Sequence, residues 1–307
     1  MKPLLRTLLL AGLALPLLLG AGPPGEEVPE SRYLPRVGAS PPAPATSKSP
    51  EGGLEVRWDF RRPVETVYRF LHETTMTGEA NGLRSPQAET VTRGRLTLRS
   101  PGGGRAELVL HPEEVTVKSE GRTLRTDGPS EPTTVAGVEE DGRIAGARSE
   151  RQALLALLFP LPPDRLRVGS SSQRPVQLPF ALGPVRVTIQ GTATTTLVGW
   201  VEGPGRPQAR LDTVVTLTRV LTPPGTAGSL HAAGRGRSTF YWDPAVRQFT
   251  RGTLALRILG RYGYDRPNPL EGFPALRLSA VADTDQVVEI QAQEPPAAEP
   301  TPGSGGS

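Results

Sequence analysis

Serine, histidine and acidic side chains carry most hydrolytic chemistry, and this sequence does not place them at a recognisable catalytic spacing. No G-x-S-x-G pentapeptide, which sets a nucleophilic serine on a strained turn, occurs in the chain. The run Ser170–Ser172 follows Gly169 and is predicted to form a polar turn. His72, His111 and His231 are far apart and lack metal-site spacing, so we expect surface or strand-end histidines. No catalytic residue is assigned.

Three groups of neighbouring carboxylates could perform acid–base work or bind a cation. Glu113 and Glu114 are adjacent, and adjacent strand residues point to opposite faces, so they are not expected to converge. Asp283 and Asp285 would share a face, but two carboxylates alone make a poor calcium site. We interpret these groups, and the run Glu139–Asp141, as solvated turns and surfaces.

One segment, Gly260–Phe273, combines aromatic and arginine side chains of the kind that recognition surfaces use. The alternative is a long connection whose aromatic rings pack on a sheet edge. The candidate recognition loop consists of Arg261, Tyr262, Tyr264, Asp265 and Arg266.

Cofactor and metal chemistry find little support in the residue types. The chain has no cysteine, which excludes disulfides, cysteine nucleophiles, thiolate metal sites and a lipid-modified N-terminal cysteine. The stretch Gly234–Arg237 lacks the third glycine of a dinucleotide loop and precedes a predicted strand, so we expect a flexible or close-packed segment. No cofactor and no metal ligand are assigned.

The charge is modest, with 35 basic and 31 acidic residues and a net charge of +4. All basic residues except Lys2, Lys48 and Lys118 are arginines, which can form paired contacts to phosphate or carboxylate. Acidic residues are interleaved throughout, and no basic run reaches five residues. Nucleic acid is therefore not a predicted partner.

The first 22 residues are typical of a secretory signal peptide. Lys2 and Arg6 form a positive start, Thr7–Leu19 is apolar, and Gly20–Gly22 are small, as cleavage requires. The alternative, an uncleaved anchor, is disfavoured because the apolar stretch is shorter than the roughly 20 residues that span a bilayer. We therefore expect an exported protein, periplasmic or extracellular, with no stable transmembrane span after the leader is removed.

The flanking segments differ in composition from the rest of the chain. Residues 23–52 are rich in proline and predict an extended, disordered linker, and residues 292–307 predict a disordered tail. The folded domain is predicted over 53–291.

Period-two alternation of apolar and polar residues dominates the folded domain. Leu54, Val56, Trp58 and Phe60 alternate with polar residues, which predicts a half-buried strand. Further strands are predicted over the ranges 65–77, 90–99, 106–110, 115–117, 133–139, 185–201, 211–217, 237–242, 249–258, 276–280 and 287–290. Asp141-Gly142 indicates a hairpin turn between 133–139 and 143–145.

One helix is predicted over 149–159. Ser149 and Gln152 have capping-box spacing, and Ala153–Phe159 is apolar on nearly every side, so the helix should be buried. The fold class is therefore mainly β: a large antiparallel curved sheet or partly closed β-barrel of about ten or more strands around this helix. The segments 53–145 and 176–291 on either side have a similar plan, which suggests two halves joined by the helix.

Four segments carry a resemblance to known proteins: Val67–Thr77, Asp141-Gly142, Leu158–Ser172 and Thr239–Phe249. In these the chain resembles an uncharacterised family of secreted bacterial β-rich proteins of unknown function. More loosely, the layout is similar to the curved-sheet lipoprotein carriers of the bacterial envelope. That resemblance implies an apolar concave face that holds acyl chains.

These observations favour a non-enzymatic exported protein that binds a hydrophobic ligand or lipid on a curved β-sheet. The alternative is an envelope interaction or structural module tethered by its proline-rich linker. An outer-membrane barrel is disfavoured because only 5% of the residues are aromatic, too few for two interfacial girdles. An enzyme is disfavoured by the missing catalytic motifs.

Overall fold

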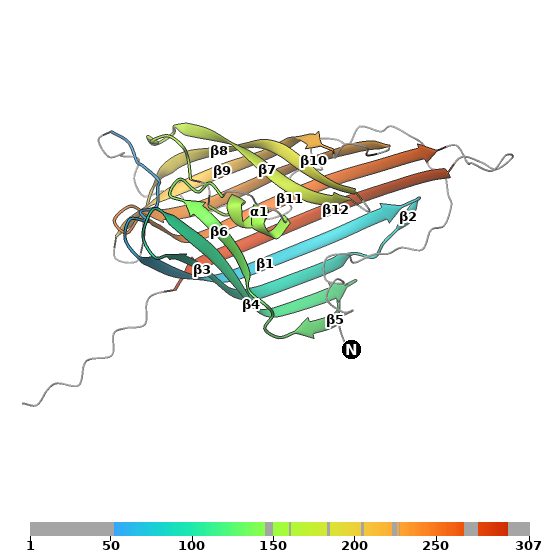
Figure 1. Ribbon diagram of the computed structural model, residues 1–307, viewed down its shortest axis with the longest axis horizontal. Helices are drawn as coiled ribbons and strands as arrows, with labels where there is room; N and C mark the ends of the chain where they lie inside the picture. Colours follow the sequence, from blue (N-terminus) through green and yellow to red (C-terminus); the bar gives the residue numbers. More distant parts are fainter. Residues whose placement is uncertain are drawn as a thin grey trace, which may run out of the picture.

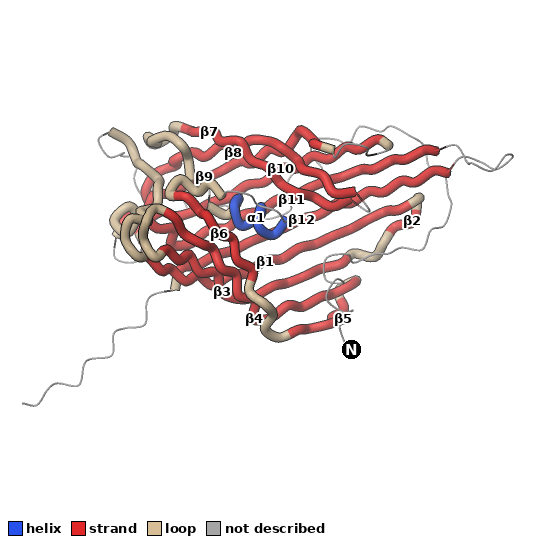
Figure 2. Tube along the Cα trace, in the orientation of Figure 1, coloured by secondary structure: helices blue, strands red, loops and turns tan. Residues whose placement is uncertain are grey.

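The computed structural model describes residues 52–144, 150–159, 161–182, 185–203, 206–222, 226, 228–266 and 276–293. Its described part is a single antiparallel sheet of twelve strands with one short helix, α1 (Glu150–Leu157). The sheet is curved, and α1 lies in front of its concave side (Figures 1 and 2). The mainly β class predicted from the alternation is therefore confirmed, with the sheet open rather than closed.

Six strands precede α1 and six follow it. The first group is β1 (Val64–Ala80), β2 (Leu83–Arg84), β3 (Ala88–Ser100), β4 (Arg105–Ser119), β5 (Arg122–Asp127) and β6 (Thr133–Glu139). The second is β7 (Ser171–Leu182), β8 (Val185–Glu202), β9 (Pro207–Leu221), β10 (Ser229–Asp243), β11 (Gln248–Arg266) and β12 (Leu276–Ala292).

The strand order is that of a long meander, β5-β4-β3-β1-β12-β11-β10-β9-β8-β7. The two groups of strands join where β1 pairs with β12, from Tyr68 opposite Ala292 to Ala80 opposite Ala280. β2 pairs with the end of β1, and β6 pairs with β4 beside the part that β5 leaves unpaired. The described sheet therefore ends at β7 on one side and at β5 and β6 on the other.

Apolar side chains on the concave, inner face are covered at one end of the sheet, which we call the covered end. α1 packs against β7 and buries Leu154, Leu155 and Phe159 of its helix and exit. The extended segment 54–60 adds Trp58 and Phe60, which are 2% and 0% exposed. Together they form a plug over the first half of β1 and the last half of β12.

Aromatic rings form the centre of this plug. The Phe159 ring lies 5.1 Å from Trp58, 5.9 Å from Tyr68 and 5.5 Å from Phe249, measured between centroids. Phe240 stacks over Gly252 of the neighbouring strand, where a Cβ atom would lie 1.9 Å from the ring. Glycine is required at position 252 because this ring occupies the space of a side chain.

Segment 54–60 was predicted as a strand, and the structure corrects this. Its apolar side chains do point into the core, but its main chain joins no described ladder: it makes a bridge from Leu54 to Leu166 and single hydrogen bonds from Trp58 N to Glu140 O, from Phe60 N to Glu140 Oε1 and from Gly104 N to Phe60 O. The segment crosses the gap between β6 and β7 rather than joining a ladder. In this segment the alternation of apolar and polar residues therefore indicates burial of the apolar side chains and not pairing with a neighbouring strand.

Other strands extend beyond their predicted boundaries. The two strands predicted at 276–280 and 287–290 are one strand, β12, because polar inner residues such as Thr284 and Gln286 interrupt the apolar pattern without interrupting the ladder. β12 ends at Ala292, just inside the predicted tail. The Asp141-Gly142 turn is present, but only the isolated bridge Val138–Ile144 follows it.

The predicted leader, residues 1–22, the linker up to residue 51 and the tail from residue 294 lie outside the described residues. So does Ser149 of the predicted capping box. None of the described helices is long and apolar enough to cross a membrane.

Candidate functional site

The two faces of the sheet differ in charge beyond the plug, at the end we call the open end. β1, β11 and β12 run well past α1 in this direction (Figure 1). The register places Thr74, Met76 and Ala80 of β1 on the same face as buried Tyr68 and Phe70, because strand residues two apart share a face. Their partners on β12 are the uncharged residues Gln286, Thr284 and Ala280.

Charged residues of the same strands lie at outer positions, interspersed with threonines and valines. These outer positions carry Glu73 and Glu79 on β1, Asp283 and Asp285 on β12, and Arg257 on β11. The described inner side chains of this stretch from Thr74 to Tyr264 are therefore uncharged apart from any charge on His72, although several of them reach solvent, and Arg266 takes the next inner register position, opposite Leu276. An exposed face without charges is suited to an uncharged or apolar partner.

We define the inner patch as the uncharged, partly exposed inner positions at the open end. Met76 is 39% exposed and Leu83 is 46% exposed, whereas apolar inner residues at the covered end are nearly all below 5%. Leu83 shares the inner face because it pairs with Ala80. The inner patch consists of Met76, Gly78, Ala80, Leu83, Tyr262, Tyr264, Leu278, Ala280 and Ala282.

The described part of the predicted recognition loop lies on a strand, which corrects the expectation of a loop there; residues 267–273 lie outside the described residues. Arg261, Tyr262, Tyr264 and Asp265 belong to β11, which ends at Arg266. The alternation divides them: Tyr262 and Tyr264 pair with Ala280 and Leu278 on the inner face.

Arg261 and Asp265 occupy the outer face, where Asp265 forms an ion pair with Arg277 at 3.3 Å. The side chain of Arg266 lies outside the description. The structure therefore brings the two tyrosines of the predicted set into the inner patch and places Arg261 and Asp265 on the outer face, while Arg266 has an inner register position opposite Leu276.

A polar band separates the inner patch from the plug. Thr92 and Gln286 are 4% exposed and Thr284 is 1% exposed, and the Thr74 hydroxyl lies 3.0 Å from His72 Nε2. The Thr284 hydroxyl has no hydrogen-bond partner within the described part of the chain. The band offers neutral donors and acceptors and no formal charge apart from any that His72 carries.

The acidic pair Asp283 and Asp285 does share one face, as expected, and an arginine holds it. Arg257 donates to Asp283 at 2.9 and 2.6 Å and lies 3.8 Å from Asp285. These hydrogen bonds to Asp283 raise the pKa of Arg257 above its usual value. Arg257 thereby offsets one of the two negative charges and occupies the space between the carboxylates on the outer face.

Glu113 and Glu114 behave differently from the prediction. They bind Arg95 and Arg93 at 2.7 Å each, and both arginines lie on the outer face of β3. A bulge in β4 at this point inserts an extra residue, so two consecutive glutamates reach the same face. Each still has its own arginine partner, and the two do not form a catalytic pair.

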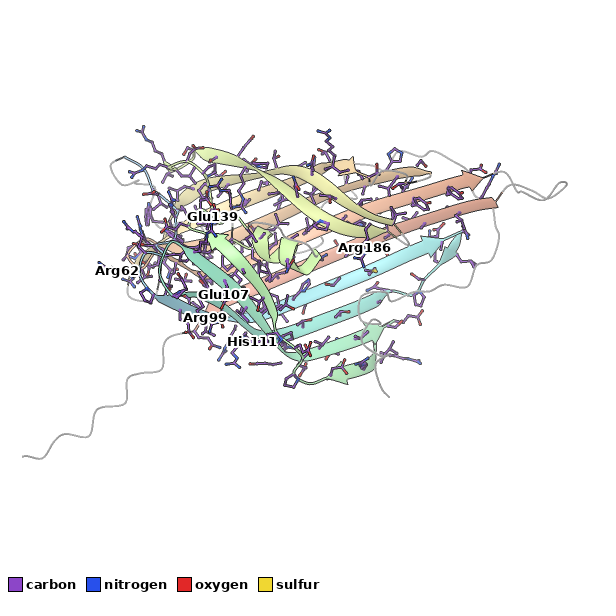
Figure 3. The ribbon with its side chains drawn as sticks, viewed as in Figure 1. Arg62, Arg99, Glu107, His111, Glu139 and Arg186 are labelled. Atoms are coloured by element: carbon purple, nitrogen blue, oxygen red, sulfur yellow. The ribbon has the colours of Figure 1, made fainter. Side chains whose placement is uncertain are left out.

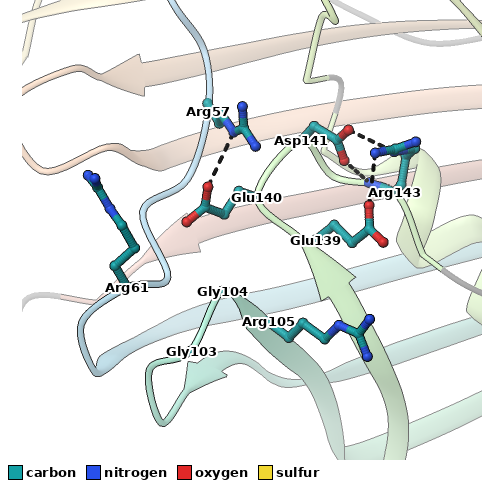
Figure 4. A pocket seen from close by; sticks show the side chains of 9 residues that line it. All are labelled: Arg57, Arg61, Gly103, Gly104, Arg105, Glu139, Glu140, Asp141 and Arg143. Carbon is teal, nitrogen blue, oxygen red and sulfur yellow. Dashed lines mark hydrogen bonds and ion pairs between the residues drawn. The ribbon is translucent and has the colours of Figure 1, made fainter.

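The turn residues Glu139, Glu140 and Asp141 line a charged surface depression of about 610 Å³ (Figure 4). Arg143 binds Glu139 at 3.0 Å and Asp141 at 2.7 Å, while Arg57 binds Glu140 at 3.3 Å. Arg99 and Glu107 form a further ion pair on the outer face, between β3 and β4 (Figure 3). The acidic run is therefore a solvated, ion-paired turn.

The serines and histidines lie apart. Ser170 bonds to the main chain of Arg167, and Ser172 donates to Asp164 at 2.6 Å. His72 is on β1, His111 on β4 and His231 on β10. Within the described ranges no three His, Asp or Glu side chains are grouped to hold a metal ion.

Met76 and Leu83 were missed by sequence reasoning. The signal for Met76 was present, because the period that places Phe70 inside also places residue 76 inside. Leu83 had no such signal, since its face depends on a two-residue strand that returns against β1.

Comparison with known proteins does not assign the chain to a family. No family model matches it, and no curated protein matches it. Among solved structures, the crystal structure of Pseudomonas aeruginosa OccK2 (OpdF) matches with 7% identity and a TM-score of 0.20, over 75% of this chain and 98% of that one. A TM-score of 0.20 is too low to indicate a common fold. The chain is thus a mainly β protein with an open twelve-stranded sheet, outside the families compared.

Proposed function

We propose that the protein is an exported, non-enzymatic binding protein that holds a hydrophobic ligand on the inner patch. The observation that carries this proposal is the contrast between the faces of β1, β11 and β12 at the open end. Their charged, ion-paired residues, such as Arg257, Asp283 and Asp265, lie at outer positions, while the inner patch consists of uncharged, partly exposed side chains. A soluble surface would ordinarily place charges at such exposed positions.

The residue types indicate an amphiphile with an apolar chain and a neutral polar group. Met76, Leu83 and the rings of Tyr262 and Tyr264 supply apolar area, and methionine adapts its shape to flexible chains. The polar band behind them supplies hydroxyl and amide groups for an ester, amide or hydroxyl. This agrees with the lipid-carrier likeness in the sequence, and the leader supports an envelope location.

The proposal predicts that a charge on the inner patch weakens ligand binding. Met76→Asp should reduce the affinity for a fluorescent fatty-acid ester about tenfold or more, since about 1.4 kcal/mol corresponds to a factor of ten and a desolvated carboxylate costs more. Fluorescence titration of the purified protein measures this, with circular dichroism to confirm that the variant is folded.

Val214→Asp is the matched control. Val214 is 48% exposed on the outer face of β9, so the same substitution there changes net charge equally without touching the inner patch. Equal losses in the two variants would contradict the site. Absence of probe binding by the unaltered protein, together with absence of extractable lipid by mass spectrometry, would contradict the function.

A further inference from the structure

The two edge strands of the described sheet, β7 and β5, differ in whether their free edge can pair with a further strand. β7 pairs with β8 along its whole length and carries Pro175 and Pro179, four residues apart. Main-chain groups alternate between the two edges of a strand, so both imide nitrogens lie on the same edge, the one away from β8. That edge lacks two donors and is poorly suited to accept a further strand.

β5 presents an edge without proline. It follows β4 through the two-residue turn Glu120-Gly121, whose φ values are 48° and 76°. Five of its six residues are exposed, and Leu124, at 67%, is the most exposed large apolar side chain in the described structure. No described strand pairs with its other edge.

A bulge gives β5 a symmetric arrangement of its side chains. Arg122 lies opposite Ser119 and Asp127 opposite Val115, and both partners belong to the inner face through β3. In a regular strand, residues five positions apart such as Arg122 and Asp127 would lie on opposite faces. The register shift opposite Val117 and Lys118 adds one residue, so both ends of β5 face inward.

Thr123 and Thr126 face outward by the same register, opposite Lys118 and Thr116. The strand Arg122–Asp127 therefore reads the same from either end: inward, outward, two central residues, outward, inward.

This pattern is complementary to itself. When β5 is placed antiparallel to a second β5 about a two-fold axis between Leu124 and Arg125, Arg122 lies opposite Asp127 of the other copy, whose carboxylate also accepts from Arg125 of its own strand at 2.6 Å. Thr123 lies opposite Thr126, a favourable cross-strand pair, and the Arg125 stem covers the exposed Leu124. The sheet would continue with the same face inward in both copies, which a two-fold axis normal to the sheet requires.

We infer that β5 is an interface for a second copy of this chain, which pairs edge to edge to extend the sheet across a two-fold axis. A register shifted by two residues in one direction brings Arg122 opposite Arg125 of the other copy, and a shift in the other direction leaves Asp127 opposite Leu124, so the charges favour the symmetric register. Six residues per copy bury less than a standard interface, so the dimer forms in a concentration-dependent way.

Two charge reversals test the inference in one experiment. Arg122→Asp leaves two acidic residues facing two acidic residues, and Asp127→Arg leaves two basic residues facing two basic residues. Each variant alone should sediment as a monomer at concentrations where the unaltered full chain shows dimer. An equimolar mixture should recover the dimer, because every facing pair is then opposite in charge.

Asp265→Arg serves as the control, since it breaks a comparably exposed ion pair with Arg277 away from β5. It should leave the dimer intact. The inference is overturned if the unaltered chain stays monomeric at every concentration, if the mixture stays monomeric, or if Asp265→Arg dissociates the dimer. Recovery in the mixture also shows that both variants are folded.

Discussion

The hydroxyl of Tyr68 lies in the centre of the molecule, beside Phe159, and the residue is 0% exposed. No described group is within hydrogen-bond distance of it. Burial raises the pKa of Tyr68 above its usual value of 10.0, since the charged form would lose its hydration. An unpaired buried hydroxyl costs about 1–3 kcal/mol of stability.

Tyr68→Phe is therefore expected to stabilise the protein by about 1 kcal/mol, as measured by urea unfolding at neutral pH. The raised pKa adds a pH dependence: the unfolded state releases its proton near pH 10 while the folded state retains it, so stability is lost as pH rises above 10. The variant should lack this alkaline loss.

Tyr264→Phe is the comparison, because Tyr264 is partly exposed and its hydroxyl can be hydrated. It should change the stability little. A Tyr68→Phe protein less stable than the parent would show that the hydroxyl has a bound partner, such as an internal water.

At the scale of elements, α1 and segment 54–60 together form the plug that covers the inner face at the covered end. The helix spans eight residues, too short to be stable without tertiary contacts. It is held by its apolar surroundings and by Arg174, which donates to the Ala156 carbonyl at 3.0 Å near the helix end. Desolvation lowers the pKa of this buried arginine.

Phe159→Ala should remove the centre of the plug and destabilise the protein by about 3–5 kcal/mol, the range for large aromatic truncations in cores. Val246→Ala, in the turn between β10 and β11 and 45% exposed, should change stability by less than about 0.5 kcal/mol. Thermal or urea unfolding measures both. Equal effects would mean that the plug contributes nothing beyond surface area.

The helix itself was predictable, and its place was not. Ala153–Phe159 is apolar on all sides, which predicts burial, and the structure buries it. Which face of which strands it covers depends on contacts between residues far apart in sequence. The segment 54–60 shows the same limit, because a buried alternating pattern appears whether or not a neighbouring strand supplies hydrogen bonds.

At the scale of the whole molecule, period-two alternation predicted a large antiparallel curved sheet or a partly closed barrel of about ten or more strands, and the described structure is an open sheet of twelve. The strand order could not be predicted, since pairing depends on register across loops. Part of the inner patch was predicted from the sequence. Tyr262 and Tyr264 were selected by residue type, but the adjacent glycines and charged residues hid the alternation that places them on a strand. Small residues at inner positions, such as Gly260 beneath Phe180, conceal alternation.

The leader predicts that the exported protein is shorter than the full 32.7 kDa chain. Expressed in a bacterial host, it should be recovered outside the cytoplasm with a mass lowered by about the first 22 residues. Lys2→Glu with Arg6→Glu should reduce export, because the positive start of the leader is lost. Intact mass spectrometry of cell fractions measures both, and an exported form that keeps Met1 would contradict cleavage.

The pairing of β1 with β12 has a consequence for the order of events after synthesis. The last described strand of the chain lies in the middle of the sheet, not at its edge. Strands on either side of α1 can form local hairpins early, but their union waits for the final residues of β12. A chain that crosses a membrane N-terminus first therefore cannot complete its sheet until nearly all of it has crossed. The native state is delayed until the end of that translocation.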